Sequence, residues 1–476
     1  MKNTIVKITI LAAMVLCWGN ELYGDTEKAT IKELSLDEFI EMSCANDEVF
    51  EEILVESLKL NYLKKLKLPA DDIILSVKNN YAAFLRSDKG NPEYQFSLAK
   101  LFPDTGTNIG AGYLSKAEGP DGWGINGEFY ALVSQPVARN AFGRTNRLLD
   151  KIVGMEIDIA WYQIVEAYEK YLAAIINIYY DWNEAYENLK TAENSYKENM
   201  KILDNVKERE RNNIALPVDV NKVLLQVMLK EETMLEAGNS FREYANLLRK
   251  SIGYDVQGTL IPGGPDRFEG IEIDFDEEYR VFREKGRTSL ILDMLEEKSA
   301  LEVDKYADAL LPSVELFAEY RIKGADRYLE KDDKRVFVGF TMDYPFPGQV
   351  ENAEYETSKI DHDMRVLNRT NTQIRIYTDL RNIYQEIEKE KKLIKIAAEK
   401  IKVSESVVRD DSVNYSYGRV VLNNFIDEVN RLDLNRFSLI QRNIRLKKLI
   451  IEWLTLTDRL VREEGKALAI DPKSRS

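Results

Sequence analysis

The side chains that could carry out catalysis or bind a metal are few in this chain. It has one histidine, His362, and two cysteines, Cys17 and Cys44. A zinc site needs several His or Cys ligands at close spacing, and the stretch around His362 supplies none. The sequence contains no P-loop, dinucleotide-binding fingerprint or nucleophile elbow. We therefore predict that the protein is not an enzyme and uses no cofactor or metal, so that its function depends on its shape.

The first 24 residues have the composition of a secretory signal peptide. Lysines precede an apolar core at Ile8–Leu16, and Gly24 is a small residue suitable for cleavage. The apolar core is well short of the ~20 residues that a membrane-spanning helix needs, which argues against an anchor. Cys17 leaves lipoprotein processing open as an alternative, although the preceding leucine is bulkier than that processing favours. We expect export with removal of residues 1–24.

Charge, cysteine content and hydropathy limit the partners and the location that we expect for the exported chain. The net charge of −15 argues against nucleic acid as a partner. After removal of the signal segment Cys44 is the only cysteine, so the chain can form no internal disulfide. No later stretch is long and apolar enough for a transmembrane helix. An exported protein of this kind either stays soluble in the periplasm or forms a membrane β-barrel.

A very long helix organises the first half of the chain. From Trp161 to Leu203 apolar side chains recur at alternating intervals of three and four residues, interrupted only by Glu193. That spacing is typical of helices packed nearly parallel over a long distance. Neither proline nor a capping pattern intervenes between Phe142 and Arg211, so we predict a helix roughly 100 Å long.

A second helix runs back along the first. The sequence RNNIALPVDV interrupts the helical pattern, and Asn213 can adopt the left-handed conformation of a tight helix ending. Pro217 and Asp219 then favour a new helix start, followed by apolar positions from Val220 to Ile252. We predict two antiparallel helices joined by a short turn.

Before the long helix, the apolar period is two rather than three and four. Alternation from Ile73 to Arg86 exceeds the length of a typical globular strand, and alternating stretches follow at 94–102, 106–116 and 123–134. Each has one apolar and one polar face, as in strands of membrane β-barrels. Candidates for an aromatic girdle at the membrane interface, with ordinary strand packing as the alternative, are Tyr81, Trp123, Phe129, Tyr130, Tyr320 and Tyr344.

The same order of elements recurs, which indicates an internal duplication. The predicted organisation is a signal peptide at 1–24; a first repeat at 25–253 with helices at 36–68, β segments at 73–137 and a long helical hairpin at 142–252; a connecting region at 254–311 with the first helix of the second repeat; a second repeat at 312–462 with strands at 312–344 and a long helical hairpin at 349–460; and a flexible tail at 463–476. The predicted fold class is mainly α with a transmembrane β-barrel part.

This arrangement resembles the outer-membrane efflux protein family of the TolC type. The resemblance rests on QPVARNAFGR before the first long helix, YPFPGQVENAEY before its counterpart and the two hairpin tips, and it covers about residues 34–460. It implies a homotrimer, in which strands of three copies close one barrel in outer-membrane lipid and the helices enclose a periplasmic tunnel. The strands at 94–102 and 106–116 form an additional hairpin relative to the simplest family pattern, which leaves the strand number of the barrel open.

The resemblance also implies partners and a closable aperture. Family members work with a periplasmic adaptor (membrane fusion) protein and an inner-membrane transporter, which open the periplasmic tip. The closing contacts of the family match Tyr415 and Asp219 here, a pair suited to a charge-assisted hydrogen bond. An N-terminal helix cap is a second, compatible role for Asp219. Arg419 lies one position before the arginine of the family, so its pairing with Asp219 stays open.

Two further sets of residues follow from the same match. Asn424 and Asp427 correspond to acidic positions that form charged rings inside the aperture, and three copies of Asp427 would favour cations. The alternative is that Asp427 is an ordinary exposed helix residue. The tips that would dock the adaptor are Asn213, Ile214, Ala215 and Leu216 in one turn and Tyr417, Gly418 and Arg419 in the other. A left-handed turn would equally explain Gly418.

Two functions follow as hypotheses. The first is a passive trimeric exit duct of a tripartite efflux or type I secretion system, placed in the outer membrane with a periplasmic helical extension. The alternative is a periplasmic structural coiled-coil protein without a transport role. A helix of roughly 100 Å has the right scale to cross most of a periplasm, which favours the duct.

Overall fold

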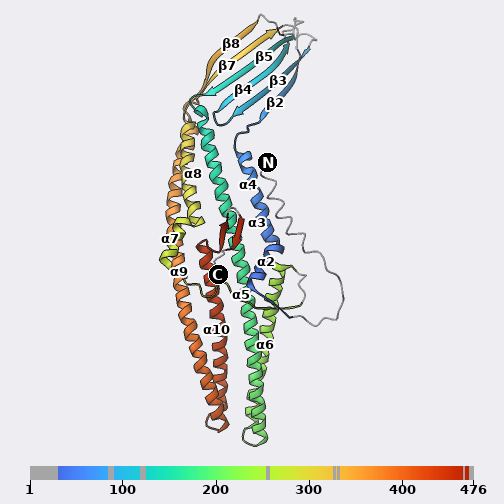
Figure 1. The fold of residues 1–476 in the computed structure, drawn as a ribbon, viewed down its shortest axis with the longest axis vertical. Coiled ribbons are helices and arrows are strands. Elements are labelled where there is room, and N and C mark those ends of the chain that lie inside the picture. Colours follow the sequence, from blue (N-terminus) through green and yellow to red (C-terminus); the bar gives the residue numbers. More distant parts are fainter. Residues whose placement is uncertain are drawn as a thin grey trace.

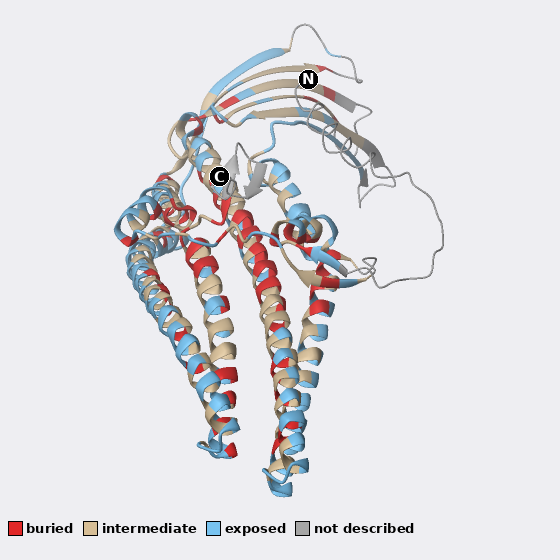
Figure 2. Ribbon diagram, turned by 60° about the horizontal axis from the view of Figure 1, so that its bottom comes forward, coloured by how far each residue is buried: buried red, intermediate tan, exposed pale blue. Residues whose placement is uncertain are grey.

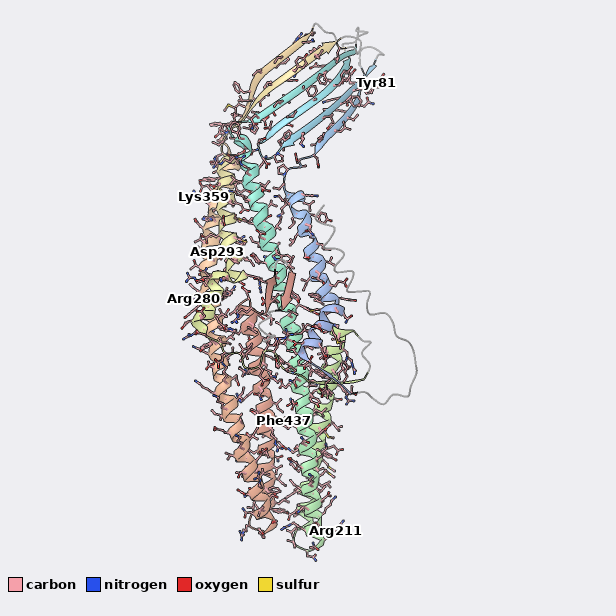
Figure 3. All side chains as sticks on the ribbon, viewed as in Figure 1. Tyr81, Arg211, Arg280, Asp293, Lys359 and Phe437 are labelled. Carbon is pink, nitrogen blue, oxygen red and sulfur yellow. The ribbon has the colours of Figure 1, made fainter. Side chains whose placement is uncertain are left out.

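The computed structural model describes residues 31–83, 90–117, 125–253, 258–324, 329, 333–464 and 467–470. Its long axis runs from a β-sheet at one end to two helical hairpin turns at the other (Figure 1). Tyr81 lies in the sheet and Arg211 lies at the opposite end (Figure 3). The described chain is therefore an elongated bundle of helices that carries one large sheet.

Four long helices make up most of this length. α5 spans Arg144–Arg211 and α9 spans Gln349–Ser416, each with 68 residues, so each extends for about 100 Å. Their antiparallel partners are α6, Pro217–Ile252, and α10, Leu422–Leu456. α9 packs on α10, α10 on α5 and α5 on α6, so the four helices form a row (Figure 1). They lie where the apolar spacing predicts the two long hairpins.

The start of α5 differs slightly from the prediction near Phe142, because the backbone before Arg144 is left-handed. Asn140 has a φ of 55°, Phe142 of 47° and Gly143 of 75°. Only glycine fits at Gly143, where an added Cβ would lie 2.4 Å from the carbonyl oxygen of Asp104. The sequence QPVARNAFGR is thus the sharp turn that joins the sheet to the long helix.

Five shorter helices fill the remaining helical part of the described chain. They are α2 (Leu36–Asn46), α3 (Glu48–Leu58), α4 (Leu60–Lys67), α7 (Phe275–Lys285) and α8 (Arg287–Ala309). Ser35 and Glu38 form a capping box at the start of α2, and the Asp47 side chain caps α3. α3 and α4 pack along α5, while α8 lies between α5 and α9 (Figure 1).

The large sheet is antiparallel and has six strands. They are β2 (Ile73–Ala83), β3 (Gly90–Phe102), β4 (Thr107–Ala117), β5 (Ile125–Pro136), β7 (Ser313–Gly324) and β8 (Lys334–Asp343). They lie in the order β2-β3-β4-β5-β7-β8, so β2 and β8 are the edges. The additional hairpin predicted at 94–116 is β3–β4, and it lies inside this sheet rather than beside it.

One face of the sheet is apolar across all six strands. Directly paired residues point to the same face, so the register defines it. Its apolar members are Ile73, Leu75 and Val77 in β2, Phe96 and Leu98 in β3, Ile109, Ala111 and Tyr113 in β4, Phe129, Ala131 and Val133 in β5, Val314, Leu316, Ala318, Tyr320 and Ile322 in β7, and Val336, Val338, Phe340 and Met342 in β8. Val338 is 80% exposed and Val336 is 70% exposed.

The opposite face of the sheet is mostly polar. It carries the charged groups Glu128, Arg321 and Lys323, among which Arg321 lies 3.3 Å from Glu128. Tyr130 pairs with Arg321 and belongs to this face, not to the apolar face that an aromatic girdle would occupy, so ordinary strand packing, the alternative, applies to it. Phe129 and Tyr320 do lie on the apolar face, and Trp123 falls outside the described residues.

Two small sheets differ from the sequence-based expectation. β1 (Ile31–Leu34) pairs in parallel with β6 (Thr259–Pro262), inside a region predicted only as a connection. β9 (Val461–Glu464) pairs with β10 (Ala467–Ile470), in a region where a flexible tail is predicted from 463. The physical reason is that backbone N–H groups at Leu460 and Val461 donate to the buried Glu169 carboxylate, which fixes the start of this hairpin.

The main core lies midway along the helices. Its largest fully buried side chains include Trp182, Trp453, Tyr180 and Phe39, from α5, α10 and α2. Buried residues follow α5 most densely, whereas the sheet is mostly intermediate or exposed (Figure 2). Among the described helices, none combines the length and the apolar composition that crossing a bilayer requires.

Candidate functional site at the hairpin tips

The two tips of the helical hairpins have the same turn. At the first, Asn213 is left-handed, and the Ile214 N–H donates to the Arg209 carbonyl oxygen at 2.8 Å. At the second, Gly418 is left-handed, and the Arg419 N–H donates to the Asn414 carbonyl oxygen at 2.9 Å. These six-to-one hydrogen bonds are typical of Schellman helix endings. The predicted left-handed conformations at Asn213 and Gly418 are confirmed.

Asp219 caps the helix that leaves the first tip. Its carboxylate accepts a hydrogen bond from the Leu216 backbone N–H at 3.2 Å, and Pro217 is the first residue of α6. A carboxylate at this position also interacts favourably with the positive end of the helix. The capping role predicted for Asp219 is confirmed.

Arg209 joins the two tips. Its Nη1 donates to the Ser416 carbonyl oxygen at 2.8 Å, and its guanidinium lies 4.7 Å from the centre of the Tyr415 ring. Tyr415 stacks in turn on Phe425 of α10, with ring centres 5.8 Å apart. We call the contact of Arg209 with Tyr415 and Ser416 the tip contact.

The tip contact differs from the predicted closure. Burial raises the pKa of Tyr415, the Arg209 charge opposes that shift, and the Asp219 charge adds to it, so both charged groups lie near the phenol. Within the described residues, however, the Tyr415 hydroxyl makes no hydrogen bond to Asp219, whose carboxylate is engaged by the Leu216 backbone. Arg419 stacks on Tyr417, 5.4 Å from the ring centre, and forms no ion pair with Asp219 among the described contacts.

Behind the turns, α6 and α10 are linked by polar contacts beside a small apolar cluster. Lys222 Nζ lies 3.2 Å from Asn423 Oδ1, and Gln226 Nε2 donates to Asn430 Oδ1 at 2.5 Å. The cluster consists of Leu203, Val206, Val223, Val227 and Leu422, with Tyr415 packed against it. The two hairpin ends of one subunit therefore hold each other together.

Asp433 is a deeply buried charged group of the lower helices. It is 2% exposed, accepts a hydrogen bond from Ser195 of α5, and pairs with Lys230 of α6, whose Nζ lies 2.8 Å away. Three helices therefore meet at one carboxylate of α10.

We expect Asp433→Ala to lower the free energy of unfolding by about 3–5 kcal/mol, because Lys230 and Ser195 would lose their partner inside the bundle. Denaturant unfolding followed by circular dichroism of the purified protein measures this change. Asp427→Ala on the exposed side of α10 is the matched control and should leave the unfolding midpoint in place. Equal midpoints for the two variants would contradict the structural role of Asp433.

The remaining predicted site residues are accessible. Ile214 is 64% exposed, Leu216 is 63% exposed and Tyr417 is 71% exposed, so apolar surface is available at both turns. Asn213, Asn424 and Asp427 are also exposed, whereas Ala215 is only partly so. Asn424 and Asp427 lie three residues apart on one side of α10.

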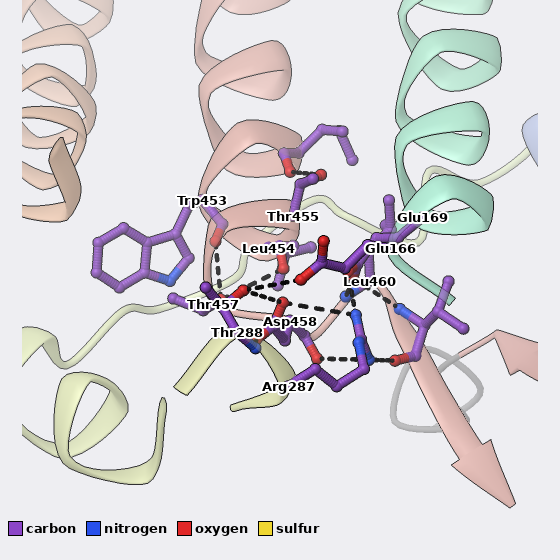
Figure 4. Close-up of polar contacts among 12 residues, drawn as sticks. Glu166, Glu169, Arg287, Thr288, Trp453, Leu454, Thr455, Thr457, Asp458 and Leu460 are labelled. Carbon is purple, nitrogen blue, oxygen red and sulfur yellow. Dashed lines mark hydrogen bonds and ion pairs between the residues drawn. The ribbon is translucent and has the colours of Figure 1, made fainter. Parts of the chain in front are cut away.

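A buried ionic network lies at the level of the main core (Figure 4). Arg287 at the start of α8 pairs with Glu169 of α5, and its Nη1 donates to the Val461 carbonyl oxygen at 2.9 Å. Asp458, after α10, accepts a hydrogen bond from the Thr288 N–H at 3.1 Å. Burial raises the pKa of Glu169 to about 7, while the Arg287 charge lowers it. The network fixes α5, α8 and the end of α10 relative to one another.

Sequence reasoning missed Arg209, Asp433 and the Arg287 network. Each joins segments far apart in the chain: 207 residues separate Arg209 from Ser416. For Asp433 the sequence offers one hint, a charged residue within the apolar pattern of a long helix. Many charged residues on the protein surface look the same in the sequence, so this hint does not single out Asp433. Within the described residues, no group of three or more His, Cys, Asp or Glu side chains is arranged to hold a metal ion.

Solved structures of bacterial outer-membrane channels share this architecture. The outer-membrane channel OprN matches with a TM-score of 0.67 and 10% identity, over 89% of this chain and 89% of OprN. CusC, which forms a transmembrane channel, matches with a TM-score of 0.67 and 10% identity over 92% of this chain and 95% of CusC. The outer membrane protein VceC of Vibrio cholerae matches with a TM-score of 0.66 and 13% identity over 89% and 95%. No family model and no curated protein matches the sequence.

The matched proteins are membrane channels rather than enzymes, which agrees with the prediction that this protein is not an enzyme. The resemblance drawn from the sequence is confirmed by fold similarity that spans about nine tenths of the chain. The described chain has the fold of the outer-membrane efflux channels of the TolC type.

Proposed function

We propose that this protein is the outer-membrane exit duct of a tripartite efflux or type I secretion system. It acts as a passive homotrimeric channel that an inner-membrane pump and its periplasmic adaptor open at the tip. The observation that carries the proposal is a six-stranded sheet with an exposed apolar face, mounted at one end of helices about 100 Å long.

The sheet supports a place in the outer membrane. In water an apolar face of this extent would need a covering layer, and no described element covers Val336, Val338 and Phe340, which stay largely exposed. Lipid would cover such a face, and a polar opposite face would line an aqueous interior. A membrane sheet cannot keep open edges, so several copies have to close one barrel.

The helices support a tunnel built from copies of the same chain. In the row α9-α10-α5-α6, the outer helices carry exposed apolar residues that nothing in the described subunit covers. In α6 these are Leu225, Met228, Leu229 and Leu235, and in the part of α9 at the same level they are Ile396, Val403 and Val413. A neighbouring copy would place α6 against α9 and continue the row. Three copies would enclose a tube that continues the axis of the barrel.

The tips support a gate. Each subunit closes its tip through single hydrogen bonds and one cation–π contact, which a partner protein can replace at low cost. The exposed apolar residues Ile214, Leu216 and Tyr417 are the docking points that an adaptor would use, and Asp427 would face the aperture. The MtrE channel of Neisseria gonorrhoeae, which matches with a TM-score of 0.65, was solved in an open state. That match supports a tip that moves.

The same proposal includes the organisation predicted from the sequence. Residues 1–24 would direct export, with lipidation at Cys17 as the lesser alternative, and the repeats at 25–253 and 312–462 would be related by duplication. The identical turns at the two tips support such a relation.

Fractionation and conductance test the proposed function. We expect the full-length protein, produced in a Gram-negative host, to fractionate with the outer membrane and to run on gels as a trimer that dissociates on heating. In planar bilayers it should form channels. Recovery in the soluble periplasm without conductance would overturn the duct and favour the structural coiled-coil protein.

A further inference from the structure

The β3–β4 hairpin adds two strands to the sheet of each subunit. We infer that three copies join β2 to β8 of the neighbouring copy and close a barrel of eighteen strands, six from each subunit. This inference rests on the proposed trimer, and it names the surface through which copies meet in the membrane. The partner at each sheet edge is therefore a second copy of this chain.

The hairpin is an integral part of the sheet. β3 pairs with β2 from Ile73 to Ala83, and β4 pairs with β5 over Asn108 to Ala117. Tyr130 of β5 lies over Gly112 of β4, where an added Cβ would come within 2.7 Å of the ring. An aromatic side chain that covers a glycine on the next strand ties the two strands together.

The turn of the hairpin is fixed to the start of α5. The Gln135 side chain donates to the Thr105 carbonyl oxygen at 2.8 Å. Asn146 Nδ2 donates to the Pro103 carbonyl oxygen at 2.8 Å, and Arg147 Nη1 donates to the Asp104 carbonyl oxygen at 2.6 Å. Because the first turn of α5 holds the hairpin, β3 and β4 cannot swing out of the sheet without breaking these bonds.

The two sheet edges fit each other. β2 has 11 residues and β8 has 10, and neighbouring strands alternate in direction through the sheet. With an even number of strands, β2 of one copy and β8 of the next are antiparallel. Val77 on β2 and Val338 on β8 are 61% and 80% exposed and both belong to the apolar face. Joining the edges would keep that face continuous and leave no unpaired backbone in lipid.

The hairpin adds circumference without filling the interior. In the middle of the hairpin the residues on the polar face are small, with Ser97 opposite Gly112 and Ala99 opposite Gly110, whereas the larger Gln95 and Leu114 pair nearer one end. For strands spaced about 4.8 Å apart and tilted by about 40°, eighteen strands give a barrel about 36 Å across between backbones, against about 24 Å for twelve. Barrels of 16–18 strands leave an open aqueous channel. We therefore expect an exit that admits bulky solutes from the outer side.

Disulfide cross-linking in the intact protein tests the joint between copies. In a Cys44→Ser background, Val77→Cys is combined with Val336→Cys, Val338→Cys or Phe340→Cys, which samples several registers. At least one pair should give a covalent ladder up to the trimer on non-reducing gels. Phe96→Cys on β3, combined with the same β8 positions, is the control and should give none. Cross-links from Phe96, or none from Val77 in a protein that still forms trimers, would overturn the inference.

Solute exclusion tests the width. Deletion of residues 90–117 would leave β2 beside β5, which are antiparallel, and would reduce each sheet to four strands. Neutral polyethylene glycol of about 10 Å radius, added on the barrel side of bilayers, should enter the full-length channel and reduce its conductance. In the deletion variant this reduction should be lost. A channel that conducts but excludes the polymer in both forms would overturn the inference and leave the proposed function intact, whereas absence of trimers and of conductance in the full-length protein would overturn the proposed function itself.

Discussion

Arg209→Ala is expected to raise the open probability of the reconstituted channel at least tenfold. Each subunit would lose a hydrogen bond worth about 1 kcal/mol and a cation–π contact worth about 0.5–2 kcal/mol between its two tips. A trimer loses both contacts three times, and tenfold corresponds to only about 1.4 kcal/mol. Single-channel recording in planar bilayers, without adaptor or pump, measures the change.

The chain offers a matched control for this experiment. Arg211 is exposed at the same helix end, so Arg211→Ala removes an equal charge without removing the tip contact. Its open probability should equal that of the unmodified protein. If Arg209→Ala and Arg211→Ala behave alike, the tip contact does not keep the channel closed.

Substitutions of Tyr415 distinguish closure through the tip contact from closure through a hydrogen bond between Tyr415 and Asp219. Tyr415→Phe keeps a ring beneath Arg209 and should leave the channel mostly closed, while Tyr415→Ala should open it. If closure instead depended on a phenol–carboxylate bond, Tyr415→Phe combined with Asp219→Ala would open the channel as fully as Arg209→Ala. The geometry favours the first outcome, because Asp219 already bonds to the Leu216 backbone.

The long helices and strands could be predicted because their signal is local. The three-and-four spacing through Trp161 and Leu203 repeats for many turns, and the strict alternation from Ile73 onward repeats over a whole strand. Turn chemistry is equally local, so the left-handed residues Asn213 and Gly418 were identifiable from residue type and position.

There is a physical reason why the contacts between elements could not be predicted from the sequence. β1 and β6 are four residues long and pair in parallel across more than 200 residues of chain, without an alternating pattern to reveal them. The hairpin at 94–116 was identifiable as two strands, but its place inside the sheet depends on register with β2 and β5. No pattern in the sequence connects the positions of Arg209 and Tyr415. Tertiary packing alone brings them together.

Arg287→Met should lower the free energy of unfolding by about 3–5 kcal/mol, a loss as large as the one expected for Asp433→Ala. Methionine fills a similar volume but leaves the buried carboxylates of Glu169 and Asp458 without their cation. It also removes the bond to the Val461 carbonyl oxygen that fixes the start of β9. Guanidinium unfolding of the purified protein, followed by circular dichroism, measures the loss. Arg280→Met is the control, because Arg280 pairs with Glu277 on the exposed surface of α7 and should be replaceable without a measurable shift.

The loss at Arg287 should also depend on pH in a defined direction. Burial raises the pKa of Glu169 to about 7 in the folded protein, above the ordinary carboxyl value of 4.5 that it has when unfolded. Such a group supports folding at low pH and ceases to do so as pH rises through the folded pKa. Without the Arg287 charge, the pKa of Glu169 rises further. At pH 8 the free-energy cost of burying the ionised carboxylate therefore grows, whereas at pH 5 the carboxyl is protonated and its burial costs little. Arg287→Met should therefore destabilise the protein more at pH 8 than at pH 5, and the double variant with Glu169→Gln should lose most of this difference. An equal loss at both pH values would mean that Arg287 acts through its backbone contacts and not through the buried charges.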